Sequence, residues 1–331
     1  MTSSWAGRGS RGVTLLELIA VIVIFSLLLA FSIGYMRVAD QDLGVTAAAH
    51  HVIALLRGAH QVSRGDASPA WVVLRTRENS VFMMAKETLG EWHFEDPPEE
   101  GAFGRRARIT GGTLVPGRVG QALLLGGGQV DGGEVPVHDP AQGIAVECWL
   151  LWQPAGGRQV LCTVGRLLEI AVEGDGRVQA RLGNLSVSSR DLRLPQGFPQ
   201  PLWCSLQLLY GGGELRLYLN DRLTEAKAGP LAWTESASFV VGDRNSPFKG
   251  AVDELRLSLI LPRDVYDLPG QARFVLAPPA VPNPQTGEYV IHFDPEGRLD
   301  PARHSQPVRF SLKSPAGERV VEVGLEGTVQ R

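Results

Sequence analysis

The longest apolar segment of the chain lies close to its N-terminus. It runs from Val13 to Ile33, and Glu17 is its one charged residue. A helix of that length spans about 30 Å, the thickness of the hydrocarbon layer of a bilayer. We therefore expect residues 13–34 to form the transmembrane part of a long N-terminal helix.

The charges that flank this segment predict its orientation. Arg8 and Arg11 precede it, whereas Asp40 and Asp42 follow it. Positive charge favours the cytoplasmic side, so the N-terminus should be cytoplasmic and the remainder exported. A cleaved secretory signal is the alternative, but the segment is long and lacks an obvious small-x-small cleavage site. A carboxylate in lipid is costly, so Glu17 should have a partner.

Residues 35–87 are expected to form the part of the helix beyond the membrane and the first strands of the head. Apolar residues recur every three or four positions, which predicts one stripe packed on a globular body: Val45, Ala48, Val52, Leu55, Leu56, Ala59 and Val62. The helix should end by Pro69 and be followed by strands 71–77 and 81–85. Histidines in this helix suit surface or packing positions better than a metal site: His50, His51 and His60.

From about Leu89 to Pro262 the pattern changes to short alternating strands separated by glycine turns. The expected strands are 144–152, 160–164, 168–172, 178–182, 202–210, 214–220, 239–241 and 251–259. Many short strands at regular spacing predict an antiparallel sandwich or jelly roll. After a stiff proline-rich connector at 277–284, residues 289–299 are expected to form a strand followed by a glycine turn. Further strands are expected at 308–312 and 320–323, before Gly327.

Composition and motifs restrict the function. The 331 residues carry 32 basic and 35 acidic side chains, so nucleic acid is not an expected partner. No hydrolase, zinc-protease or phosphate-loop motif occurs, and no paired carboxylates alternate along a strand, so we expect no enzyme. Three cysteines, Cys148, Cys162 and Cys204, fit either buried thiols or a Cys148–Cys204 disulfide.

Residues 11–18, Arg-Gly-Val-Thr-Leu-Leu-Glu-Leu, resemble the processing site of type IV pilins and type II secretion pseudopilins. The resemblance implies that a prepilin peptidase removes the leader 1–12 by cutting between Gly12 and Val13, and methylates the new amine. It also implies that Glu17 neutralises the amine of a neighbouring subunit in a filament. Val13 departs from the phenylalanine usual at the first mature position.

Four segments in order resemble laminin-G-like, concanavalin A-like jelly rolls: 92–96, 116–123, 146–150 and 250–257. The tail, residues 265–331, resembles the closing strands of the H-type (GspH/FimT) minor pseudopilins through Phe293-Asp-Pro-Glu-Gly-Arg298. Together these resemblances imply an α+β, mostly β protein. A long transmembrane helix carries a small pseudopilin β head, and a jelly roll at 88–264 interrupts that head.

Some jelly rolls of this kind hold Ca²⁺ with carboxylates at one rim, and Asp96, Asp243 and Asp253 are the acids nearest the matching segments. The alternative is that Asp253 anchors a strand and the others are solvated. Trp233, in a loop, is the candidate for stacking on a sugar ring, whereas Trp149 and Trp203 are expected in the core.

Two functions follow from these expectations. The protein is either a minor pseudopilin of a type II secretion-like machine or a minor pilin that acts as a tip adhesin. In both, the inner membrane holds the subunit before assembly with other pilins or pseudopilins, and the jelly roll binds a glycan or a secreted protein. A membrane-anchored glycan hydrolase is a third, weaker alternative.

Overall fold

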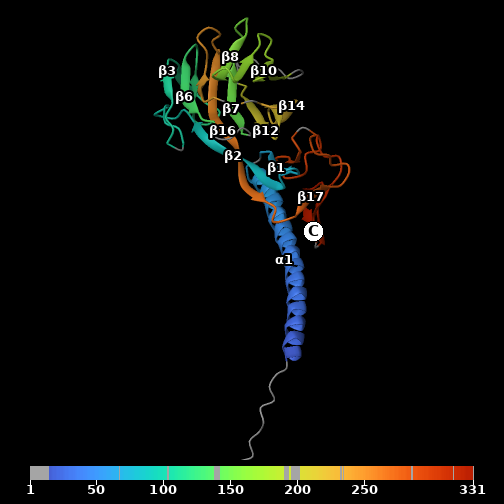
Figure 1. Cartoon of the computed structure of the whole chain (residues 1–331). Helices are drawn as coiled ribbons and strands as arrows, with labels where there is room; N and C mark the ends of the chain where they lie inside the picture. The colour runs from blue at the N-terminus through green and yellow to red at the C-terminus, as the bar shows by residue number, and fades with distance from the viewer. Residues whose placement is uncertain are drawn as a thin grey trace, which may run out of the picture.

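The structure is a computed structural model, and it describes residues 15–66, 68–102, 104–137, 142–189, 194, 202–231, 233, 235–284, 286–315 and 317–330. Within helix α1, the side chains of residues 16–17 and 32–42 are also outside the description. The described part is mostly β and carries one long helix as a stem that projects from a β body (Figure 1).

Helix α1 spans Leu15–Gly65. Within the described residues, no helix meets the length and apolarity expected of a membrane span. The predicted stripe of the second half is confirmed, since Val45 to Ala59 are buried at its positions and Val62 packs at its edge.

The largest sheet is continuous across the whole β body. Its path runs β14-β13-β12-β7-β16-β2-β1-β18, with β5 on β16 and β4 on β5. The strands are β1 Ala70–Arg75, β2 Ser80–Trp92, β4 Thr113–Pro116, β5 Gln121–Leu124, β7 Gly143–Trp152, β12 Cys204–Gly211, β13 Glu214–Leu219, β14 Arg222–Ala228, β16 Gly250–Asp267 and β18 Glu288–Phe293.

Two further sheets complete the fold. One has the order β11-β10-β9-β8-β15-β6-β3 and faces the large sheet. Its strands are β3 Arg108–Thr110, β6 Gln129–Val135, β8 Gln159–Val164, β9 Leu168–Val172, β10 Val178–Leu182, β11 Leu185–Ser188 and β15 Ala237–Val241. The other sheet packs on α1 and comprises β17 Arg273–Leu276, β19 Val308–Ser314, β20 Gly317–Val323 and β21 Val329–Gln330.

These elements enclose separate apolar cores. The two large sheets form a jelly-roll-like sandwich around Trp92, Phe239 and the inward residues of β7 and β12. A second core lies between α1, β1, β2, β18 and the C-terminal sheet, so the N- and C-terminal segments of the chain pack together as a head. The core of the sandwich thus lies apart from that of the head.

The two longest strands connect the head to the sandwich. β2 and β16 pair from Trp92 and Leu255 in the sandwich to Ser80 and Asp267 beside α1, and Figure 1 shows both crossing between the two parts. The boundaries expected at 87/88 and 264/265 fall inside these strands. Period-two patterning does not distinguish one long strand from two short ones, so the sequence could not place the junction.

Candidate functional site

The N-terminal signal is only partly within the described residues. Gly12 and Val13 lie outside them, and Glu17 is in α1 but its side chain is not described. Downstream, α1 presents large, more than half-exposed apolar side chains on its first turns. They are Leu15, Leu18, Ile19, Val21, Ile22, Val23, Ile24, Phe25, Leu27, Leu28, Leu29 and Phe31. Exposed apolar surface on this scale marks a membrane or protein contact.

A row of polar side chains crosses the outer face of the large sheet. The strand register aligns one residue from each of five neighbouring strands: Tyr218, Gln207, Glu147, Arg256 and Glu91. All five are half-buried. Alternate residues of a strand share a face, so the row lies opposite the sandwich core.

Glu147 is the centre of this row. Its carboxylate accepts hydrogen bonds from Lys86 Nζ at 3.0 Å and from Gln207 Nε2. Arg256 donates to Glu91 through Nε at 3.0 Å and places Nη1 3.9 Å from Glu147. Burial lowers the pKa of Arg256, but the bond to Glu91 and the carboxylate charges outweigh it, so the net shift is upward. Gln207, Glu147, Arg256 and Glu91 are therefore linked to one another by hydrogen bonds and ion pairs.

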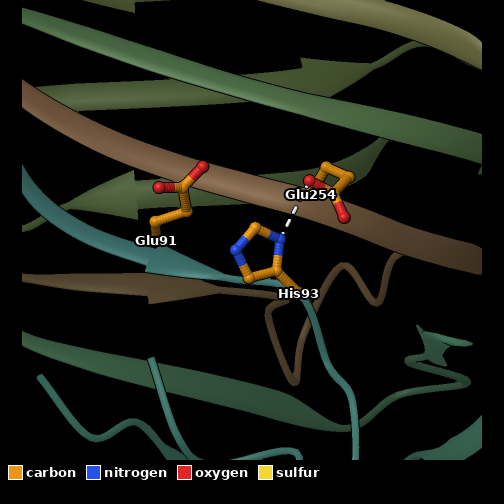
Figure 2. A group of neighbouring side chains, drawn as sticks. All are labelled: Glu91, His93 and Glu254. Carbon is orange, nitrogen blue, oxygen red and sulfur yellow. Dashed lines mark hydrogen bonds and ion pairs between the residues drawn. The ribbon is translucent and has the colours of Figure 1, made fainter. Parts of the chain in front are cut away.

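A group of possible metal ligands lies at the end of the row. Glu91, His93 and Glu254 each offer one ligand atom, and these atoms lie within 4.8 Å of one another. His93 Nδ1 is 2.9 Å from Glu254 Oε2. Figure 2 shows the imidazole ring between the two glutamate side chains.

Sequence reasoning missed this group because a β-bulge disturbs the alternation of β16. The register on β7 shifts between Asp253 and Arg256, and Glu254 has a left-handed φ of 49°. The bulge brings Glu254 beside His93, just beyond the end of β2. The sequence signal for this group was the pair Trp92-His93 with acidic residues close by. The spacing of these residues alone does not predict a bulge.

The acids expected to bind Ca²⁺ do not form a ligand group among the described residues. Asp253 is buried, and its Oδ2 accepts the amides of Arg118 at 2.7 Å and Val119 at 3.0 Å. Burial raises its pKa, although these amide bonds oppose the shift. Asp253 thus anchors the loop between β4 and β5, the alternative that the sequence also allowed.

The other two acids lie elsewhere. Asp243 Oδ1 accepts the amides of Asn245 at 2.8 Å and Ser246 at 2.6 Å, a local turn. Asp96 is exposed, and it is its neighbour Glu95 that accepts the amide of Gln121 at 3.1 Å. The three aspartates are therefore tied to separate backbone segments.

The structure corrects the expectations for the tryptophans. Trp233 is 3% exposed, and its indole N–H donates to the carbonyl of Glu235 at 3.0 Å, so it is a core residue. Trp149 instead lies on the outer face beyond Glu147, half-buried, with the Arg118 guanidinium 4.9 Å from its ring centre. Trp203 is also half-buried and packs against the small apolar cluster that contains Leu151. The loop containing Trp233 folds back on the sandwich, which local sequence does not reveal.

The cysteines are buried thiols and not a disulfide, and a histidine of the helix has a packing role. Cys148, Cys162 and Cys204 are buried free thiols, and burial raises the pKa of all three. His51 stacks on Tyr266 with ring centres 3.9 Å apart. The expected packing role of this part of the helix is thus observed for His51.

A buried ion-pair network joins the head to the sandwich. Arg216 on β13 donates to Glu214 and, across the junction, to Asp300, both at 2.8 Å. Arg303 also pairs with Glu214. Beside the network, a cavity of about 820 Å³ lies between the 279–284 segment and residues 303–308.

Two family models match the chain. Residues 7–33 match the prokaryotic N-terminal methylation motif, which includes the Gly12–Glu17 signal. Residues 126–259 match the concanavalin A-like lectin/glucanase superfamily. The chain therefore combines a type IV pilin-like N-terminus with a concanavalin A-like domain. No curated protein sequence matches it.

Solved structures resemble parts of the chain at low sequence identity and with low TM-scores. Domain 4 of an extracellular arabinanase from Geobacillus stearothermophilus, in complex with arabinotriose, is 18% identical, and the match covers 52% of this chain and 92% of that chain with a TM-score of 0.41. The binding domain of botulinum neurotoxin DC, in complex with rat synaptotagmin II, is 8% identical (71% and 73% covered, TM-score 0.40). Trypanosoma rangeli sialidase is 11% identical (52% and 30%, 0.40).

Proposed function

We propose that this protein is a minor pseudopilin whose jelly roll binds a glycan or a protein partner outside the cytoplasm. A prepilin peptidase removes residues 1–12 and methylates Val13. The apolar half of α1 crosses the inner membrane until the subunit enters a filament of a type II secretion-like machine. Glu17 then neutralises the N-terminal amine of a neighbouring subunit.

One observation carries this proposal: a methylation-motif match and a concanavalin A-like match occur in the same chain. The exposed apolar side chains of α1 support membrane insertion and later helix packing. Strands β18 to β21 close a small head on α1, in keeping with an H-type head. A tip adhesin of a surface pilus would have the same parts, but it would be displayed on the cell surface.

The outer face of the large sheet is the proposed ligand surface. Its row offers amide, carboxylate and guanidinium groups suited to sugar hydroxyls, with the ring of Tyr218 at one end of the row and that of Trp149 next to Glu147 along β7. These side chains are already held by Lys86, Arg118 and one another. Binding would therefore immobilise few additional side chains.

Processing and assembly are tested in cells that contain a prepilin peptidase. We expect the mature protein to begin at methylated Val13, as measured by N-terminal sequencing and mass spectrometry. Glu17→Ala should still be cleaved but should be incorporated into filaments much less than the wild type. An intact Met1, a start beyond Leu29, or normal incorporation of Glu17→Ala would each count against the proposal.

Ligand binding is tested with the full chain in detergent on a glycan array, with and without Ca²⁺. Gln207→Ala should weaken any glycan signal, whereas Gln179→Ala, on the outer side of the opposite sheet, should not. A signal unaffected by Gln207→Ala would place the ligand elsewhere. If no glycan on the array is bound, a protein partner remains as the ligand class.

A further inference from the structure

We infer that Glu91, His93 and Glu254 form a binding site for a divalent transition-metal ion of the Zn²⁺ type, which links β2 to β16. This inference does not depend on the proposed function. It rests on the identity of the three donors, their separation, their charge and their access to solvent.

The donor set favours a borderline transition metal over Ca²⁺. Zn²⁺ binds imidazole nitrogen and carboxylate oxygen in small, often tetrahedral sites. Ca²⁺ needs about six to eight oxygen ligands. The group offers one imidazole and two carboxylates, and water would complete a four-coordinate sphere.

The distances between the donor atoms would allow a metal ion to bind after small movements of the side chains. Ligands of a tetrahedral site with metal–ligand bonds of about 2.0–2.2 Å are about 3.3–3.6 Å apart. His93 Nδ1 and Glu254 Oε2 are already 2.9 Å apart, and the widest separation in the group is at most 4.8 Å. Rotation of the glutamate side chains closes that difference without moving either strand.

The local charge also favours a cation. Arg256 pairs with Glu91 and Lys86 pairs with Glu147, whereas Glu254 has the imidazole of His93 as its partner. Of these carboxylates, Glu254 is the one whose close ion-pair partner is an imidazole, although the charge of Arg256 also acts on it from farther away. The arginine contacts Oε1 of Glu91, which leaves Oε2 for a metal ion.

The group is open to solvent on one side. The side chains of His93 and Glu254 are 43% and 25% exposed, and that of Glu91 is 15% exposed. An ion can therefore enter without unfolding the sandwich. A bound ion would tie the end of β2, which comes from the head, to the bulge of β16.

Calorimetric titration of the chelator-treated full chain in detergent tests the site. We expect one equivalent of Zn²⁺ to bind, with Ca²⁺ at least about tenfold weaker. Removing a residue that hydrogen-bonds to a metal ligand lowers the affinity for the metal about 10–100-fold. Loss of a ligand, in His93→Gln or Glu254→Gln, should therefore weaken Zn²⁺ at least about tenfold.

Matched variants away from the group serve as controls. His50→Gln on α1 and Glu100→Gln, an exposed acid paired with Arg106, should bind Zn²⁺ as the wild type does. Co²⁺ supplies a second readout, because a tetrahedral site gives it a strong visible absorption. That band should be lost in His93→Gln, and circular dichroism checks that each variant is folded.

The inference is overturned by any of three results. These are no Zn²⁺ binding by the wild type, equal Zn²⁺ affinity in His93→Gln and Glu254→Gln, or Ca²⁺ binding as tight as Zn²⁺. A variant that fails to fold is replaced by Glu91→Gln, which keeps the hydrogen-bonding shape of the side chain and should show the same tenfold loss.

Discussion

Trp71 on β1 packs against the glycine turn that joins β12 to β13. A Cβ at Gly211 would lie 2.8 Å from the indole Cη2, and one at Gly212 would lie 2.8 Å from its Cδ1. Gly212 and Gly213 also have positive φ values of 58° and 78°. The glycine triplet is thus needed both for its turn and for the close approach of a tryptophan from the head.

We predict that Gly212→Ala destabilises the protein more than Gly213→Ala. Both place alanine at a positive φ, at a cost of about 1–2 kcal/mol. A Cβ at Gly213 meets nothing within 4 Å, whereas the one at Gly212 meets Trp71 and adds about 1–3 kcal/mol of overpacking. Urea denaturation gives the two free energies of unfolding. Equal free energies of unfolding for the two variants would show that Trp71 can move away from the new Cβ without loss of stability.

At the scale of elements, β13 and the turn after β18 are connected through Arg216. This arginine is 4% exposed, and Glu214 is 3% exposed. Removing one member of a buried ion pair leaves an uncompensated charge and costs about 3–5 kcal/mol. The network therefore fixes the head against the sandwich as long as all of its members are present.

We accordingly predict that Arg216→Met lowers the free energy of unfolding by several kcal/mol. Arg263→Met is the control, because its ion pair with Glu87 is about half-exposed on both sides and should contribute less than about 1 kcal/mol. Thermal and urea denaturation of the full chain compare the two. A loss in Arg216→Met no larger than that in Arg263→Met would contradict the buried network.

The histidines beside this network predict a pH dependence. His304 Nε2 accepts the amide of His292 at 3.0 Å, which requires an unprotonated nitrogen. Burial, opposed by Asp300, lowers the pKa of His304 to about 4, and burial lowers that of His292 well below its usual value. The unfolded chain therefore binds more protons than the native chain between about pH 6.5 and pH 4.

Stability should consequently fall as the pH drops from about 6.5 towards 4, and it should be retained above that window. In His304→Gln, whose amide oxygen can still accept the His292 amide, the fall should be smaller. Urea denaturation at pH 7, 5.5 and 4.5 measures the effect, and an unchanged slope in His304→Gln would refute the assignment.

At the scale of the whole molecule, one continuous sheet joins the head to the sandwich, although each has its own apolar core. Trp71, Val73, Phe82 and Met84 from the head strands form a cluster with three sandwich residues: Ala145, Leu209 and Ile260. Figure 1 shows β2 and β16 running from the sandwich to the stem. The jelly roll is thus joined to the head by sheet pairing and apolar contact, in addition to its two chain connections.

We predict that residues 88–264 alone are less stable than residues 43–331. The shorter fragment removes β1 and much of β2, which uncovers Leu209 and Ile260. Burying one large apolar side chain contributes about 1.5–3 kcal/mol, so the loss should be several kcal/mol. Urea midpoints of the two fragments test this, and equal midpoints for the sandwich would mean that it folds independently.

Much of the fold could be predicted because its signals are local. The stripe on α1 and strands such as β9 and β10 depend on periodicity over a few residues. The candidate site was predicted less well. Asp253 was chosen as an acid near a matching segment and Trp233 as a tryptophan in a loop, but distant segments decide that both are buried.

Local order along the chain was enough to place the apolar N-terminal segment, the methylation signal around Gly12, and the sequence of strands. Folding in three dimensions decided the rest. It joined the head and the sandwich through β2 and β16, put Trp149 rather than Trp233 on the surface, and brought Glu254 to His93. The reason is physical: periodicity is set by neighbouring residues, whereas bulges, strand junctions and burial depend on partners more than a hundred residues away.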